Sequence, residues 1–113
     1  MIKIYHNPRC QKSREGLQLL ESTGKKIQVI KYLEDTPTVL ELTQIIETLE
    51  ISPIELVRTK EEIWKKIYKN LELSDQEIIK AMVENPRLIE RPIVIHDNKA
   101  VIGRPIENIE RIL

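Results

Sequence analysis

At 113 residues, with 18 basic and 18 acidic side chains, the chain has the length of a single domain and no net charge. Without a basic surplus it is not expected to bind nucleic acid, and no apolar run reaches the ~20 residues that cross a bilayer. A lone cysteine makes no intramolecular disulfide and no signal peptide is recognisable, so we expect a cytoplasmic protein that binds neither membrane nor nucleic acid. We also expect it to be a monomer.

The first 35 residues have the pattern of a strand, a helix and a second strand. Alternation in residues 2–6 (IKIYH) predicts a short strand, and the stretch from Gln11 to Gly24 predicts a helix that ends at the glycine. Residues 27–33 (IQVIKYL) are rich in β-branched side chains and predict another strand. This order implies that the two strands pair in parallel, through a right-handed crossover.

Residues 36–86 predict a block of helices that contains no glycine. The apolar spacing of Leu42, Ile45, Ile46 and Leu49 is helical, and Asn85-Pro86 ends the block. The predicted helix starts are an N-cap at Thr36 before Pro37 and capping boxes that pair Ser52 with Glu55, Thr59 with Glu62, and Ser74 with Glu77.

The last part of the chain predicts a hairpin and a helix. In RPIVIHDNKAVIG, two apolar runs flank a turn at HDNK, and Arg104-Pro105 starts the final helix. The complete order, βαβ, helices, then ββα, indicates an α/β thioredoxin-like fold with a helical insertion. We expect one domain over 1–113, in which 1–35 and 87–113 form the thioredoxin-like part and 36–86 the insertion.

Cys10 stands where the first strand passes into the first helix. A helix N-terminus stabilises an anion, so a thiolate here has a pKa below the usual ~8.5 and becomes nucleophilic. Ser13 completes a C-x-x-S motif, whose hydroxyl can donate a hydrogen bond to the thiolate. Most lone cysteines are inert buried side chains. Against that interpretation stands a basic neighbourhood made by Arg9, Lys12 and Arg14.

Three further residues have open interpretations. His6 is either a structural residue at a strand end or the charge partner of the thiol. Pro92 is either an ordinary loop proline or a cis-proline that faces the cysteine, as at this place in thioredoxin folds, and would then bring Arg91 to the site. His96 lies in the predicted turn and is expected to be solvated. Two histidines and one cysteine give no metal-ligand spacing, so no metal site is expected.

Four motifs spread over the whole chain resemble one family. HNPRCQKSR, LVRTKE, ERPIV and IGRP occur in the order and spacing of the glutaredoxin-coupled arsenate reductases, to which the Spx-type regulators are related. The resemblance implies that Cys10 is the nucleophile that attacks arsenate, with His6, Ser13 and Arg14 tuning its thiolate and the Ser13 hydroxyl bonded to sulfur. It also implies a cis bond at Pro92 and oxyanion-binding arginines at Arg58, Arg91 and Arg104.

The resemblance also implies a reaction. Cys10 would form a covalent thiol–arsenic adduct, with no bound cofactor, glutathione as co-substrate and glutaredoxin as partner, and arsenite would be released. Two alternatives remain open: an Spx-like regulator that binds RNA polymerase, and a glutathione-dependent thiol oxidoreductase with another substrate. Ser13 argues against the regulator, which usually senses oxidants through C-x-x-C. Gln11 and Lys12 replace the Gly-Thr of the best-known reductases and can alter the anion pocket or the partner surface.

Overall fold

The computed structural model describes all residues 1–113 and contains two compact units. The sheet unit consists of Met1–Asp35 and Arg91–Leu113, and the helical unit of Thr36–Glu90. Residues 87–90, which we expected in the thioredoxin-like part, therefore belong to the helical unit. The expectation that the chain is one domain stays a prediction.

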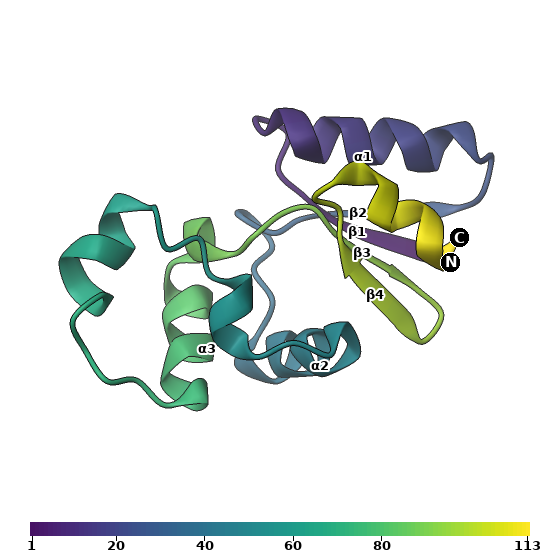
Figure 1. The fold of residues 1–113 in the computed structure, drawn as a ribbon. Helices are drawn as coiled ribbons and strands as arrows, with labels where there is room; N and C mark the ends of the chain where they lie inside the picture. The colour runs from purple at the N-terminus through teal and green to yellow at the C-terminus, as the bar shows by residue number, and fades with distance from the viewer. The chain divides into compact units, whose positions relative to one another are not determined.

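The sheet unit has the predicted mixed sheet. Its elements are β1 (Ile2–His6), α1 (Gln11–Ser22), β2 (Ile27–Lys31), β3 (Ile93–His96), β4 (Lys99–Ile102) and the 3-10 helix η4 (Ile106–Ile112). The strand order is β2-β1-β3-β4, with β1 parallel to β2 and the other neighbours antiparallel. In Figure 1, α1 and η4 lie on the same face of this sheet, and the two chain ends lie close together.

An aliphatic core joins that sheet to its two helices. Ile2 and Ile4 of β1 and Val94 of β3 pack with residues of the helices, which are Leu20 of α1 and Ile109 and Ile112 of η4. Full burial of such a side chain stabilises the fold by about 1.5–3 kcal/mol. The core therefore fixes the places where β1 passes into α1 and where β4 passes into η4.

The helical unit has its own core. Its elements are α2 (Val39–Leu49), the 3-10 helix η1 (Pro53–Leu56), the π-helix η2 (Trp64–Tyr68), α3 (Asp75–Glu84) and the 3-10 helix η3 (Pro86–Leu88). The buried side chains are mostly aliphatic, among them Leu42, Ile46, Leu56, Ile79 and Leu88, together with Met82 and Trp64. Trp64 stacks on Tyr68, whose hydroxyl accepts a hydrogen bond from Asn85 at 3.0 Å.

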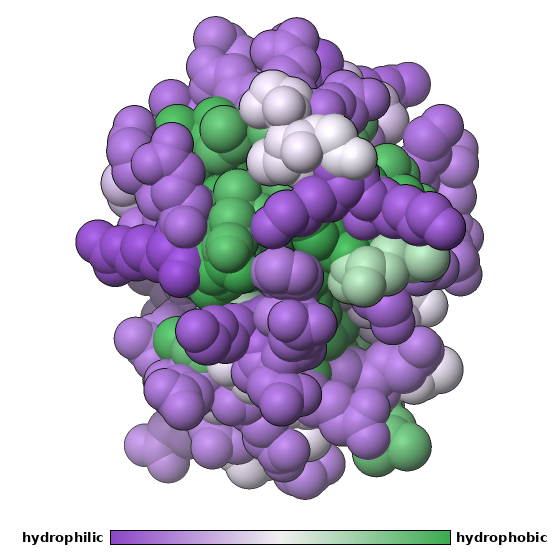
Figure 2. Space-filling view, turned by 90° about the vertical axis from the view of Figure 1, so that its right-hand side faces the viewer, coloured by the Kyte–Doolittle hydropathy of each residue, from purple (hydrophilic) through white to green (hydrophobic).

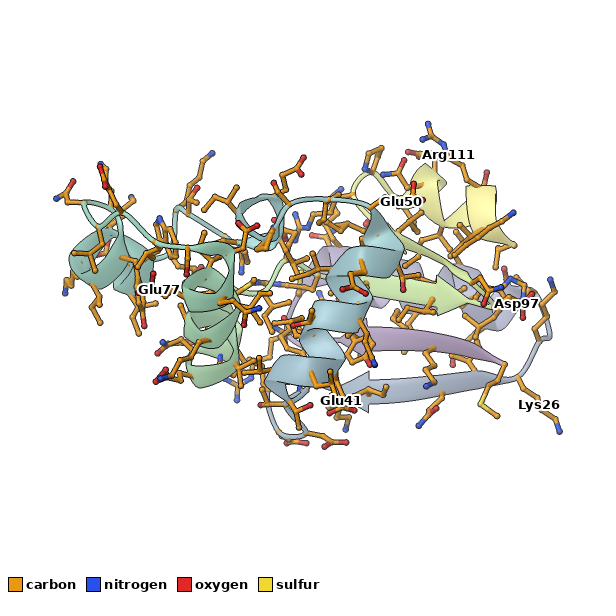
Figure 3. The ribbon with its side chains drawn as sticks, turned by 90° about the horizontal axis from the view of Figure 1, so that it is seen from below. Lys26, Glu41, Glu50, Glu77, Asp97 and Arg111 are labelled. Carbon is orange, nitrogen blue, oxygen red and sulfur yellow. The ribbon has the colours of Figure 1, made fainter.

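The helix starts confirm some predicted caps and correct others. The boxes at Ser74 and Ser52 form, although the latter opens only a short 3-10 turn. The N-cap of α2 is Thr38 and not Thr36, because Glu41 lies three residues after Thr38 and the two exchange hydrogen bonds of 3.1 and 2.9 Å. Figure 3 labels Glu41 and Glu77, the acidic members of the boxes at α2 and α3.

Thr59 caps no helix, contrary to the prediction. Its N–H donates to the Val57 carbonyl, and Glu61 donates its own N–H to Arg58 at 3.1 Å. These bonds hold residues 57–61 in turns. Regular structure resumes after them, and the helix that follows has π geometry at Trp64–Tyr68.

Three details in the sheet unit differ from expectation. β2 ends at Lys31, because the carbonyl of Lys31 accepts the N–H groups of Glu34 and Asp35 and so closes a turn. The last helix is a 3-10 helix that begins at Ile106. His96 is half-buried and not solvated, since its Nδ1 lies 2.6 Å from the Ile112 carbonyl oxygen.

The surface carries few large apolar side chains. Figure 2 shows a face on which hydrophilic residues predominate and hydrophobic ones emerge in patches between them. The most exposed apolar side chains within the helical unit are those of Leu40, Leu71 and Ile67. None of the helices combines the length and the apolar character that crossing a membrane requires.

Two glycines allow close packing around Pro92. A β-carbon on Gly103 would lie 2.9 Å from Pro92 Cγ and 3.0 Å from Ile109 Cδ1, and one on Gly16 would lie 3.1 Å from the same proline carbon. The N–H of Gly103 also donates to the Pro92 carbonyl at 2.8 Å. α1, the Arg91-Pro92 segment and the end of β4 are thus packed together without room for another methyl group.

We expect Gly103→Ala to destabilise the protein by about 1–3 kcal/mol, because the added methyl group overpacks the contact with Pro92. Urea unfolding measures the change. Arg111→Ala, at an exposed position of η4 labelled in Figure 3, is the control and should change stability by less than about 0.5 kcal/mol. An unchanged stability for Gly103→Ala would contradict the packing described here.

Candidate active site

A tight loop after β1 places Cys10 at the start of α1. The Cys10 N–H donates to the Asn7 carbonyl at 3.0 Å, and the Asn7 side-chain oxygen accepts the N–H of Arg9 at the same distance. The Cys10 carbonyl accepts the N–H of Arg14, which makes Cys10 the N-cap residue of α1. Only 8% of the residue is exposed. The sulfur therefore lies, as expected, where helix N–H groups stabilise negative charge.

Ser13 acts differently from the expectation. Its hydroxyl is fully buried, accepts the Asn7 N–H at 3.0 Å and lies 2.7 Å from His6 Nδ1, so it is bonded to these groups and not to the sulfur. The main-chain N–H of Ser13 stabilises the Cys10 thiolate instead. The side chain of Ser13 thus ties the first turn of α1 to the end of β1, and its backbone acts on the thiol.

His6 is a neutral hydrogen-bond partner and not a cation beside the thiol. Burial lowers the pKa of His6 below its usual 6.5, and the positive charges of Lys31 and Arg14 lower it further. The neutral ring therefore predominates at pH 7. His6 thus contacts the Ser13 hydroxyl through a neutral ring, and its role towards the thiol stays a prediction.

Arg91 and Arg104 reach the thiol from the other end of the chain. The Arg91-Pro92 peptide bond is cis, as expected, and the Arg104-Pro105 bond is cis as well. One guanidinium nitrogen of Arg104, Nη2, donates to Cys10 Sγ at 3.3 Å, and its Nε donates to the Arg91 carbonyl at 2.7 Å. The Arg91 side chain also hydrogen-bonds the thiol. The Cys10 sulfur thus accepts hydrogen bonds from both arginines.

The pKa of Cys10 results from opposed effects. Burial raises it, since a thiolate loses hydration inside the protein, whereas the Ser13 N–H, the hydrogen bond and charge of Arg91 and the charge of Arg104 lower it. The lowering effects prevail, so the pKa of Cys10 lies below that of an ordinary cysteine. The site therefore has the electrostatics of an activated thiol nucleophile.

The other predicted basic residues lie elsewhere. Arg14 donates to the Pro8 carbonyl at 3.0 Å and so supports the loop before the cysteine. Arg58 belongs to the helical unit, where its side chain pairs with Glu61 at 3.5 Å and Glu90 at 3.8 Å. Its N–H donates to the Leu88 carbonyl at 2.7 Å. An oxyanion-binding role for Arg58 stays a prediction.

Two asparagines that support the site were not singled out from the sequence. Asn7 closes the loop before Cys10, and its place ahead of proline in Asn-Pro-Arg is a recognisable turn signal. Asn108 donates from its side chain to the carbonyls of Ile102 and Arg104, each at 3.2 Å, and holds the segment that carries Arg104. Only the fold reveals this second role, since it depends on how η4 follows β4.

Comparison with known proteins agrees with the motifs. The model of the ArsC family matches residues 5–112. The chain belongs to the ArsC family. It is 47% identical to a Haemophilus influenzae protein named arsenate reductase and 42% identical to a Neisseria meningitidis serogroup B protein of that name. Both alignments cover 99% of this chain, with 98% and 97% of the relatives.

Solved structures confirm the thioredoxin-like α/β fold of this ArsC family member. The arsenate reductase from Vibrio cholerae superposes with a TM-score of 0.94 at 46% identity, over 99% of this chain and 97% of that one. An ArsC family related protein from Bacteroides fragilis has a TM-score of 0.86 at 20% identity, over 99% and 98% of the two chains. The latter likeness concerns the fold alone.

We expect Arg91→Gln and Arg104→Gln each to raise the pKa of Cys10, because each removes a positive charge that favours the thiolate. Titration of the thiolate by its ultraviolet absorbance measures the pKa. Arg111→Gln, an exposed position of η4, is the charge-matched control in the same unit and should leave it unchanged. An unaltered pKa in both site variants would refute the assigned electrostatics.

We expect His6 to weaken the fold in acid. Its pKa in the folded protein is lowered, so below about pH 6.5 the unfolded chain takes up a proton that the folded chain resists. The free energy of unfolding should therefore decrease as the pH falls from 6.5 towards the folded pKa. Urea unfolding across this range measures the slope, which His6→Asn should reduce. Equal slopes in wild type and His6→Asn would argue against a buried neutral His6.

Proposed function

We propose that the protein is an arsenate reductase that uses glutathione and glutaredoxin. The observation that carries this proposal is the set of groups on Cys10, a thiol of lowered pKa that shares hydrogen bonds with Arg91 and Arg104. Guanidinium groups bind tetrahedral oxyanions through charge-assisted and often bidentate bonds. Membership in the ArsC family and relatives named arsenate reductase support arsenate as that anion.

In the proposed reaction, the Cys10 thiolate attacks arsenic and displaces an oxygen, which leaves as water once protonated. The product is a covalent adduct with a sulfur–arsenic bond. Arg91 and Arg104 offset the negative charge of the arsenate oxygens as the anion approaches the thiolate. As the sulfur loses its negative charge, its hydrogen bonds to the two guanidinium groups break. Both guanidinium groups can then bind the arsenate oxygens.

Reduction of arsenic from the +5 to the +3 state requires two electrons, which two thiols supply when they join in a disulfide. The chain has one cysteine, so it cannot form that disulfide internally. Glutathione would supply the first external thiol and glutaredoxin the second. Glutathione would join arsenic with loss of a second oxygen as water, and the glutaredoxin thiolate would attack the glutathione sulfur to form a glutathione–glutaredoxin disulfide, which leaves the electron pair on arsenic as As(III). Water would then break the remaining sulfur–arsenic bond, so that arsenite leaves and Cys10 returns to the thiol form. The role of Ser13 in this scheme is to position the helix N–H at the sulfur.

We expect Cys10→Ser to lower arsenate turnover by about a thousandfold or more, because a serine hydroxyl is a far weaker nucleophile than a thiolate. Arsenite formation is measured with glutathione and glutaredoxin present. Ser22→Ala, at an exposed position near the end of α1, is the control and should keep full activity. Wild-type turnover by Cys10→Ser would disprove the proposal, and so would absence of arsenate turnover in the wild type.

A further inference from the structure

A pocket in the sheet unit lies beside the loop that leads to Cys10. It has a volume of about 270 Å³, near the ~300 Å³ lower end of small-molecule sites. Its walls are the last strand residues His6 and Lys31, the loop residues Asn7, Pro8 and Arg9 after β1, and the turn residues Leu33 and Glu34 after β2. The role proposed for Cys10 uses only the sulfur and its two arginines, so this pocket has no part in the reaction described so far.

The position of the pocket is typical of a ligand site. His6 and Lys31 are the last paired residues of the parallel strands β1 and β2, so the pocket opens at the carboxyl ends of two neighbouring parallel strands. In open α/β sheets, ligands bind at the carboxyl ends of the strands, beside the strand at which the order of the strands along the sheet reverses. Here β1 is that strand, because it has β2 on one side and the late strand β3 on the other.

The charged side chains of the pocket point to a particular kind of ligand. Arg9 and Lys31 are cationic and Glu34 is anionic, all three are exposed, and none of them forms an ion pair within the protein. Pro8 and Leu33 add apolar surface, and Leu33 is 38% exposed. Two cations, one anion and an apolar wall are complementary to a small molecule with two carboxylates, one ammonium group and methylene groups between them.

We propose that this pocket binds glutathione, a tripeptide with two carboxylates and one ammonium group. The carboxylates pair with Arg9 and Lys31, the ammonium group pairs with Glu34, and the methylene groups of the ligand contact Leu33 and Pro8. This inference rests on the proposed function, which requires an external thiol at Cys10. It goes further by naming where on this chain that thiol is held.

The distances allowed by chain geometry are compatible with this placement. Arg9 immediately precedes Cys10, and consecutive α-carbons are about 3.8 Å apart. An extended tripeptide spans about 10 Å, and the proposal requires that its central thiol reach Cys10 past the wall of the pocket that Arg9 forms. Arg91 and Arg104 reach the same sulfur from the segments before β3 and after β4, which leaves the oxyanion and the tripeptide with separate binding groups.

The binding test uses S-methylglutathione, which keeps the charges of glutathione and cannot react. We expect it to shift the amide resonances of Lys31, Leu33 and Glu34 in the full-length protein, with binding weakened about tenfold by Lys31→Glu and about twofold to fivefold by Lys31→Gln. Lys26→Glu makes the same charge change before the first residue of β2, at the opposite end of that strand and labelled in Figure 3, and should bind as the wild type does. Shifts confined to other parts of the chain, or equal binding by Lys31→Glu, would overturn the proposal.

The kinetic test separates the pocket from the chemistry. In arsenate reduction, Lys31→Glu should raise the KM for glutathione about tenfold and leave turnover supported by 2-mercaptoethanol unchanged, because that thiol has no carboxylates. Assay at pH 8 keeps His6 neutral, although Lys31 influences its pKa. An unchanged KM for glutathione would overturn the pocket assignment and leave the proposed function standing.

Binding of S-methylglutathione at the pocket without any arsenate turnover would support the pocket and contradict the proposed function. The site assignment would then stand, and the choice of arsenate as substrate would fall. Equal loss of turnover with glutathione and with 2-mercaptoethanol in Lys31→Glu would also refute the pocket, since it would show damage to the reacting centre.

Discussion

Stabilisation of negative charge on one buried sulfur is the constraint on which the site depends. A thiol with 8% exposure gains little help from water, and burial alone would keep it protonated. The protein opposes that tendency with a backbone N–H of Ser13 and with two guanidinium groups. A thiolate that is desolvated but charge-stabilised is well placed to act on an anion, because the cations that stabilise it also attract the substrate.

The fold brings these groups together from distant parts of the sequence. Cys10 follows the central strand β1, whereas Arg91 precedes β3 and Arg104 follows β4. Antiparallel pairing of β3 with both β1 and β4 places the start of β3 and the end of β4 at the edge where β1 ends. The close contact between Gly103, Pro92 and Ile109 then fixes the two arginine-bearing segments against each other. Substitutions in this packing therefore act on the reactive thiol without touching it.

The sequence predicted the parts of the structure that depend on local patterns. Alternation and runs of apolar or β-branched residues predicted the strands, the C-x-x-S motif at a strand-to-helix junction pointed to the thiol, and the resemblance carried by ERPIV implied the cis bond before Pro92. Long-range contacts were less predictable. The Ser13 hydroxyl could equally well have reached the sulfur or the end of β1, and only the fold shows that the buried ring of His6 is its partner.

Errors at the helix starts have a similar cause. Thr36 and Thr38 both precede a helical pattern, and the choice between them depends on which one lies three residues before a glutamate, here Glu41. The spacing of Thr59 and Glu62 fits a capping box as well, yet the chain there is held in turns by bonds to Val57 and Arg58. The spacing of the residues shows only that a cap is possible. Whether the cap forms depends on which backbone groups compete for the same hydrogen bonds.

The buried pair of His6 and Ser13 has an evolutionary consequence. Exchange of Ser13 for cysteine would restore the two-thiol motif C-x-x-C through a single substitution. The hydroxyl, however, has no exposed surface, accepts the Asn7 N–H and contacts the His6 ring, and a thiol is larger and a weaker hydrogen-bond acceptor. A buried polar group left without its partner costs about 1–3 kcal/mol. A two-thiol version of this site would therefore need compensating changes around His6 and Asn7 as well as the exchange of Ser13.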